Sequence, residues 1–265
     1  MISTLENTFY SRIGGRICEA WVRVVEIQKA FDILQNGKEK WRMKVRNRIC
    51  FVVALIVILS FGKVCLAFED EGFQYWSSAG ASFDINKDWQ CRYEEEFRLA
   101  NDGGHLYYHH SDLGFIYKSL ADWIDLGFNY RQVFEKDNKG QWRQENRPHI
   151  NVTLKGRLFG LDISDRSRFE YRDFENKKDV WRYRNKVTVK LPVELTELKL
   201  TPYLADEVFI TLDDDNVDRN RFYSGASFNL SKNIKADIFY LWQSSRSAKE
   251  WKDINVLGTS LRFFF

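Results

Sequence analysis

Arginine and carboxylate side chains recur at every second position along several segments of the chain. In residues 89–99, for example, four charged residues alternate with residues that are mostly aromatic or apolar. A guanidinium stays charged at neutral pH and binds a carboxylate through two parallel hydrogen bonds. The spacing therefore predicts one face of closely set Arg and carboxylate groups. The residues that we predict on this face include Arg92, Glu94, Glu96, Arg98, Arg131, Glu145, Arg147, Arg168, Glu170, Arg172, Arg182, Arg184, Glu207 and Arg221.

Two interpretations of this charged face remain open. The charges could neutralise one another and fill a narrow space, which would make the protein a structural component. Alternatively, the excess of Arg between residues 143 and 186 could line a small, weakly anion-selective passive channel, as in small porins for acidic oligosaccharides. We predict the passive channel first and the structural role second.

A third group of residues points to a different chemistry. His109 and Ser111 lie on one face of a predicted strand, and Glu95 is an acid on the otherwise apolar face of the preceding one. A carboxylate, an imidazole and a hydroxyl in sequence can activate a serine for acyl transfer. This His-X-Ser arrangement resembles the one in outer-membrane lipid hydrolases. We keep acyl-chain removal by Glu95, His109 and Ser111 as the alternative function, although no oxyanion donor can be named.

The elements that must position these residues are β-strands. Residues 123–135 place apolar and aromatic side chains at even positions and polar ones at most odd positions, which is the period of a strand with two unlike faces. No stretch has a convincing helical stripe. Eleven segments share the alternation: 73–85, 89–99, 105–117, 123–135, 143–155, 161–174, 181–191, 198–211, 221–231, 234–243 and 254–265.

The lengths of these segments favour a membrane barrel over a soluble sandwich. About 10 to 13 residues match a tilted strand that crosses a bilayer and exceed the usual length of soluble strands. Short connections alternate with longer polar ones, and Trp residues lie near segment ends, as in interfacial girdles. In a soluble core these Trp residues would only fill space, but the opposite faces are too charged for that arrangement. We predict an all-β, antiparallel up-and-down transmembrane barrel of 10 to 12 strands, because bacterial barrels have even strand numbers. Twelve is preferred, since the predicted mature length divided by about 17 residues per strand and connection gives that number.

A processing segment precedes the predicted barrel. The apolar run from Ile49 to Phe61 follows basic residues and has the length of a signal-peptide core, and small Cys65 and Ala67 suit the −3 and −1 cleavage positions. We predict an N-terminal extension upstream of the true start over residues 1–42, a signal peptide over 43–67 cleaved after Ala67, and a barrel over 68–265. The alternative is a cytoplasmic helix followed by a membrane anchor.

Removing residues 1–67 changes the charge of the chain. They hold 11 basic and 5 acidic side chains out of 40 and 37, so the formal net charge changes from +3 to −3. This balance gives no reason to expect nucleic acid as a partner. The four Cys and four His lack the spacing of a metal site. We therefore predict no metal and no cofactor, and we interpret the acidic run 213–218 as a solvated loop.

The last segment indicates where the protein goes. Residues 255–265 alternate and end in Phe265, which resembles the C-terminal signal strand that the barrel-insertion machinery of Gram-negative bacteria recognises. We predict export to the outer membrane, with membrane lipid and that machinery as partners.

The mature region as a whole resembles an uncharacterised family of bacterial outer-membrane barrels, domain-of-unknown-function family 2490. The resemblance spans about residues 75–265 and implies a fold and a location but no activity. The segments that carry it are 123–131, 142–148, 166–172, 181–185, 206–209 and 220–225, which begin with Trp123, Trp142, Arg166, Trp181, Asp206 and Asn220.

Overall fold

The computed structural model describes residues 73–265 except 101–103, 159–160, 192–198, 214–215 and 248–249. The predicted extension over residues 1–42 and the signal peptide over residues 43–67 lie outside the described residues and stay predictions. No helix in the described part of the chain is long and apolar enough to cross a membrane.

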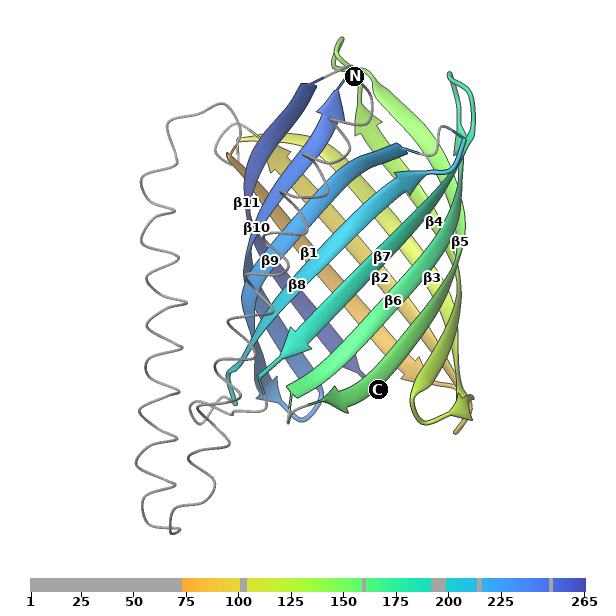
Figure 1. Ribbon diagram of the computed structural model, residues 1–265, viewed down its shortest axis with the longest axis vertical. Helices are drawn as coiled ribbons and strands as arrows, with labels where there is room; N and C mark the ends of the chain where they lie inside the picture. The colour runs from red at the N-terminus through yellow and green to blue at the C-terminus, as the bar shows by residue number, and fades with distance from the viewer. Residues whose placement is uncertain (1–72, 101–103, 159–160, 192–198, 214–215, 248–249) are drawn as a thin grey trace, which may run out of the picture. The chain divides into compact units, whose positions relative to one another are not determined.

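In the described residues, eleven strands form one closed barrel (Figure 1). Strands that follow one another in the sequence are also hydrogen-bonded neighbours in the sheet. Each of the eleven predicted segments coincides with one strand, so the alternating pattern located all of them. The strands are β1 (Phe73–Asp84), β2 (Trp89–Ala100), β3 (His105–Ala121), β4 (Ile124–Lys136), β5 (Trp142–Leu158), β6 (Leu161–Phe174), β7 (Val180–Lys190), β8 (Thr201–Thr211), β9 (Asn216–Ser231), β10 (Ile234–Ser247) and β11 (Glu250–Phe264).

The barrel closes through a parallel pair, β1 with β11, in a register that runs from Phe73 opposite Asn255 to Ser82 opposite Phe264. All other neighbours are antiparallel. The predicted range of 10 to 12 strands is confirmed, but the expectation of an even number is wrong. With an odd number, the first and last strands of an up-and-down barrel run in the same direction, so their seam must be parallel.

The end of the chain is fixed at this seam. The backbone N–H of Phe265 donates a hydrogen bond to the carbonyl of Ser82 at 2.9 Å, and its ring stacks on Phe83 with 4.9 Å between centroids. The predicted signal strand therefore pairs on both sides, with β10 and with β1.

A disulfide test addresses the parallel closure. Ala79 faces Leu261 across the seam, and both side chains point outward, so cysteines at these two positions are expected to cross-link almost completely. Purified protein on a non-reducing gel, with the other cysteines replaced, measures the reaction.

The matched control pairs Ala79→Cys with Leu257→Cys, which lies on the same face about 13 Å further along the strand. This control is expected to stay uncross-linked. Equal cross-linking of both pairs, or of neither, would contradict the register at the seam.

Several strands extend beyond the predicted segments. β9 begins at Asn216 rather than at residue 221, and β10 and β11 include most of the expected loop 244–253. Because these strands are longer than predicted, the connections between them are shorter. The contrast in length between short and long connections is therefore weaker than predicted. Polar residues continue the hydrogen-bonded ladder past the apolar part of the wall, and a pattern based on hydrophobicity cannot detect that continuation.

Two aspartates stabilise connections between strands at the end of the barrel opposite Phe265. Asp137 lies between β4 and β5, and Asp179 lies between β6 and β7. The backbone N–H groups of Gln141 and Lys139 and the guanidinium of Arg143 bind Asp137 and lower the pKa of its carboxyl group. The N–H of Phe174 and the hydroxyl of Tyr171 do the same for Asp179. Both carboxylates thus supply acceptors for turn backbone, as Asp commonly does.

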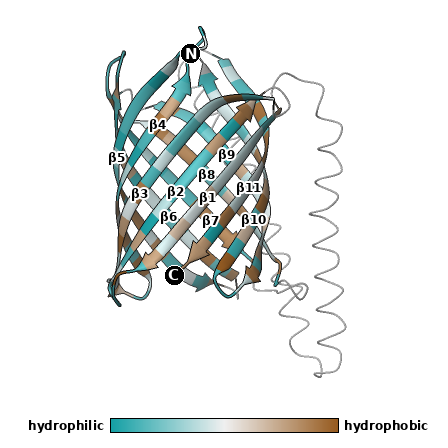
Figure 2. Ribbon diagram, turned by 180° about the vertical axis from the view of Figure 1, so that it is seen from behind, coloured by the Kyte–Doolittle hydropathy of each residue, from teal (hydrophilic) through white to brown (hydrophobic). Residues whose placement is uncertain are grey.

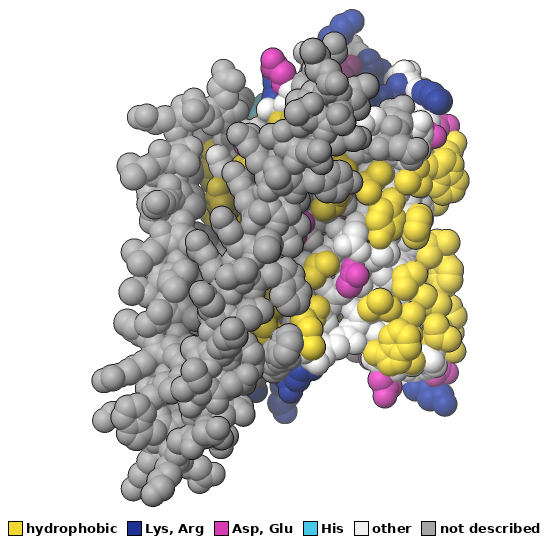
Figure 3. Space-filling view, in the orientation of Figure 1, with side chains coloured by type: hydrophobic (Ala, Val, Ile, Leu, Met, Phe, Trp, Pro, Cys, Tyr) yellow, Lys and Arg dark blue, Asp and Glu magenta, His cyan; other side chains and the backbone are white. Residues whose placement is uncertain are grey.

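The two faces of the wall differ sharply. Large apolar side chains such as Leu113, Phe128 and Phe169 point outward and are 46%, 46% and 48% exposed, whereas the buried side chains point into the lumen. On the part of the surface seen in Figure 3, hydrophobic side chains cover much of the wall, charged side chains gather mainly at its two ends, and a few acidic side chains lie part-way along it. Figure 2 shows polar and apolar residues interleaved along the strands, as the period of two requires.

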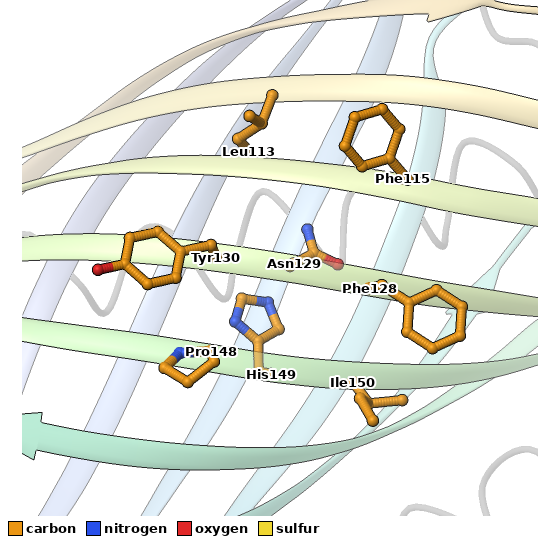
Figure 4. Close-up of a pocket in the computed structure, with 8 residues that line it drawn as sticks. All are labelled: Leu113, Phe115, Phe128, Asn129, Tyr130, Pro148, His149 and Ile150. Carbon is orange, nitrogen blue, oxygen red and sulfur yellow. The ribbon is translucent and has the colours of Figure 1, made fainter.

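A shallow apolar hollow lies on the outer wall over β3, β4 and β5 (Figure 4). Pro148 lies at its edge and has no N–H, so the ladder between β5 and β6 is interrupted between Asn146 and His149. A proline inside a strand is costly where the strand has neighbours on both sides, because it cannot donate a hydrogen bond to the ladder. The residues that line the hollow are Leu113, Phe115, Phe128, Tyr130, Pro148 and Ile150 from the outer face, together with Asn129 and His149, whose side chains face the lumen.

Candidate functional site: the charged layer of the lumen

The lumen contains a layer of buried charged side chains contributed by β2 to β9, which we call the charged layer. Among the described residues it has seven buried arginines and four buried carboxylates, so positive charge is in excess. The arginines are Arg98, Arg131, Arg147, Arg168, Arg182, Arg184 and Arg221, and the carboxylates are Asp112, Glu145, Glu170 and Glu207. They face inward because they share the parity of one strand face.

Glu207 of β8 joins four strands and is only 1% exposed. Its Oε1 accepts hydrogen bonds from Arg184 Nη2 of β7 at 2.7 Å and from Arg166 Nη2 of β6 at 3.0 Å. Its Oε2 accepts from the hydroxyl of Tyr223 of β9 at 3.0 Å and lies 3.8 Å from Arg221 Nη1. One carboxylate therefore lies among three guanidinium groups and offsets part of their positive charge.

Glu170 of β6 is a second centre and is fully buried. Its carboxylate accepts hydrogen bonds from Arg182, its direct partner on β7, and from Arg184 Nη1 at 3.4 Å. Arg168 approaches it only at 4.0 Å and instead donates to the side-chain oxygen of Asn151 at 2.7 Å. Arg168 and Arg184 lie directly opposite each other in the β6–β7 ladder, a like-charge pairing that is unfavourable by itself.

Glu145 of β5 binds two further arginines. Arg172 donates through Nε at 2.7 Å and through Nη2 at 2.9 Å to the two carboxylate oxygens, which is the bidentate geometry expected of a strong pair. Arg147 donates through Nε at 2.8 Å. The sequence predicted both arginines on the charged face, and the structure gives them a common carboxylate.

Asp112 of β3 pairs with Arg131 of β4, whose Nε donates at 2.7 Å. Asn129 adds a hydrogen bond at 2.8 Å, and His149 Nε2 lies 3.6 Å away. The imidazole Nδ1 of His149 is 3.1 Å from the carbonyl of Arg147. This part of the layer therefore links β3, β4 and β5.

The residues of β2 complete the layer. Arg98 donates to Glu96 at 2.7 Å and lies between two rings, 3.7 Å from the centroid of Trp76 and 4.0 Å from that of Tyr108. Arg92 donates to Gln90 at 3.3 Å but is exposed, so it lies outside the buried part. Arg131 Nη2 approaches Glu94 Oε1 at 3.8 Å.

The other part of the lumen is apolar. Trp76, Ala205, Tyr223, Leu241 and Val256 form a buried cluster on β1 and β8 to β11. Arginines of the charged layer contact aromatic rings at the boundary, as Arg184 does over Phe209 at 4.4 Å and Arg221 over Trp76 at 4.8 Å. The charged layer and the apolar cluster therefore contact each other inside the barrel.

The residues of the alternative hydrolase lie on the outer wall. Glu95 is directly opposite Ser111, whose hydroxyl donates to it, and Tyr93 donates to the same carboxylate. His109 instead lies opposite Phe97 and packs among aromatic rings, 4.9 Å from Phe134 between centroids. The predicted sequence of carboxylate, imidazole and hydroxyl is therefore not formed, because Glu95 contacts the hydroxyl directly.

One residue of the charged layer and one histidine beside it escaped the sequence-based selection. His110 and Asp112 are buried in the lumen, but we predicted neither of them as a lumen residue. The signal that could have found them is the parity of positions along the strand. Glu94 and Glu96 of β2 were predicted to face inward, and the residues opposite them on β3 are Asp112 and His110, at even positions. The odd positions His109 and Ser111 drew attention to the opposite face.

The fold and the charged layer define a class of protein, a closed β-barrel with a charged interior and an apolar outer wall. A family model described as Protein of unknown function (DUF2490) matches residues 73–254, from the first residue of β1 to the first part of β11. The chain belongs to this family, and the resemblance stated from the sequence is confirmed. No curated protein matches the chain.

Proposed function

We propose that the protein is an outer-membrane β-barrel whose lumen is closed by its own side chains and which serves as a structural component of the envelope. The observation that carries the membrane assignment is the reversed polarity of the wall. A water-soluble barrel hides its large apolar side chains inside, whereas here Leu113, Phe128 and Phe169 point outward and arginines are buried inside.

The C-terminal strand supports the same location. β11 ends beside Phe265 at the end of the barrel opposite the start of β1 and carries alternating apolar residues on its outer face. This strand is the segment through which the barrel-insertion machinery would recognise the protein, and membrane lipid would contact the outer wall. Both partners belong to the proposal.

The burial of the charged layer supports a closed lumen. A water-filled pore leaves its lining charges solvated, but Glu170 and Glu207 are 0% and 1% exposed. Each of them binds at least two cationic side chains from other strands. Each of these carboxylates is desolvated and held by arginines, as expected where side chains rather than water fill the lumen.

A small passive channel for anions is the second candidate, and the excess of arginine in the charged layer favours it. Three inward arginines, Arg168, Arg172 and Arg184, lie on adjacent strands β6 and β7. Rings of Arg or Lys select anions in pores. A channel would require these side chains to separate from Glu145, Glu170 and Glu207 when an ion passes.

Planar-bilayer recordings distinguish the two candidates. Wild-type protein is expected to insert without producing stepwise currents. The double variant Arg168→Ala/Arg184→Ala, which removes two side chains from the layer, is expected to conduct and thereby shows that inserted barrels are detectable. Steps of wild-type current that favour anions, and that weaken when Arg168, Arg172 and Arg184 are replaced by Ala, would overturn the closed lumen and support the channel.

A further inference from the structure

Three inward side chains lie close together on the paired strands β2 and β3. Glu94 and Glu96 are inward residues of β2, and His110 is an inward residue of β3. Glu96 is the direct partner of His110 in the ladder, and Glu94 is its diagonal neighbour. Side chains in these positions on one face of a sheet are within reach of one another.

The imidazole of His110 lies between the two carboxylates. Its Nε2 is 3.5 Å from Glu94 Oε1, and its Nδ1 is 3.8 Å from Glu96 Oε1. One ligand atom from each of the three residues lies within 4.8 Å of the other two. Donor atoms of a tetrahedral zinc site are about 3.4 Å apart, since each lies about 2.0–2.2 Å from the metal. Small side-chain rotations would bring the three groups to these positions.

The ring of His110 is also unsatisfied. It is 0% exposed, and neither nitrogen has a hydrogen-bond partner in the described residues. A buried polar atom without a partner is costly, so each such atom calls for an explanation. His149, the other buried histidine, differs in that its Nδ1 contacts the carbonyl of Arg147 at 3.1 Å.

Two arginines beside the cluster, Arg98 and Arg131, offset part of the negative charge of its carboxylates. Glu94 and Glu96 supply two negative charges, and Arg98 binds Glu96 from a position fixed between Trp76 and Tyr108. Arg131 is engaged mainly by Asp112 and approaches Glu94 only at 3.8 Å. The side chain of Glu94 is 36% exposed, which leaves this edge of the cluster accessible from the lumen.

We propose that Glu94, Glu96 and His110 bind one divalent transition-metal ion of the Zn²⁺ type. One imidazole nitrogen and two carboxylate oxygens are ligands that such ions accept, and three protein ligands leave a position for water or a small anion. The ion would join β2 to β3 and supply a partner for one of the two unpartnered nitrogens of His110. This inference goes beyond the structural role proposed above and does not depend on whether the lumen conducts.

Zinc titration of the chelator-treated, full-length folded barrel tests the site. Isothermal titration calorimetry is expected to show one Zn²⁺ per chain, and bound Zn²⁺ is expected to raise the unfolding temperature. Glu94→Gln keeps the shape of the side chain and removes its charge, and we expect it to weaken Zn²⁺ affinity by at least about tenfold. His110→Gln is expected to abolish binding.

The control is Asp125→Asn, which alters a carboxylate of β4 that is paired with Lys155 at 2.8 Å and lies outside the cluster. Its affinity for Zn²⁺ should equal that of the wild type. Absence of one-to-one binding by the wild-type protein would overturn the proposal. Unchanged affinity in folded Glu94→Gln would do so as well, and that variant remains informative if His110→Gln fails to fold.

Discussion

Replacing Glu207 by alanine is expected to lower the free energy of unfolding by about 3–5 kcal/mol, because removal of one partner leaves buried guanidinium groups without their counter-charge. Glu207 accepts hydrogen bonds from Arg166 and Arg184 and from Tyr223, and it also lies near Arg221. Among the buried carboxylates in the described residues, Glu207 is the one that contacts side chains from three other strands, β6, β7 and β9. Urea unfolding of the barrel in lipid vesicles, followed by tryptophan fluorescence, measures the change.

The matched control is Glu135→Ala. Glu135 lies on the inward face of β4 near its end and is exposed, so its loss is expected to change stability by no more than about 0.5 kcal/mol. A double variant, Glu207→Ala with Arg184→Ala, is expected to lose less than the sum of the two single changes, because the unpaired charge is removed together with its partner. Equal destabilisation by Glu207→Ala and Glu135→Ala would show that the charged layer does not depend on this carboxylate.

The charged layer illustrates what the sequence could and could not predict. Parity along a strand assigns each residue to one face, and it correctly placed Glu170, Arg182 and Glu207 inside. Parity does not reveal which charges meet, because Arg166 and Glu207 lie two strands apart and reach each other across β7. That contact depends on the curvature of the closed wall and on the tilt of the strands.

Two further features escaped prediction for a related reason: the parallel seam between β1 and β11, and the cluster of Glu94, Glu96 and His110. Both depend on pairing between strands, whereas the pattern within one strand fixes neither partner nor register. The even strand number was inferred from other bacterial barrels and not from this sequence. The prediction of no metal relied on spacing along the chain, which cannot detect ligands from two strands of a hairpin. The apolar half of the lumen was also missed, because β10 and β11 carry apolar residues on both faces.

Phe239 of β10 shows how tightly that apolar half is packed. Its partners on the two neighbouring strands are both glycines, Gly225 on β9 and Gly258 on β11. A Cβ atom at Gly258 would lie 2.0 Å from the ring of Phe239, and one at Gly225 would lie 2.7 Å from Phe239 Cβ and from the carbonyl oxygen of Ile238. The ring thus occupies the space that a side chain at residue 258 would need, an arrangement in which an aromatic covers a glycine on the adjacent strand.

Gly258→Ala is therefore expected to destabilise the barrel by about 1–3 kcal/mol, since the ring must leave its packed position. In Phe239→Leu the obstructing ring is gone, so Gly258→Ala is expected to cost less in that background, with a coupling energy of at least about 0.5 kcal/mol. Gly156→Ala is the control, because a Cβ there meets nothing within 4 Å, and its effect on urea unfolding should be small. Additive effects of Gly258→Ala and Phe239→Leu would contradict the contact and would indicate that residue 258 is sensitive for a reason other than the ring above it.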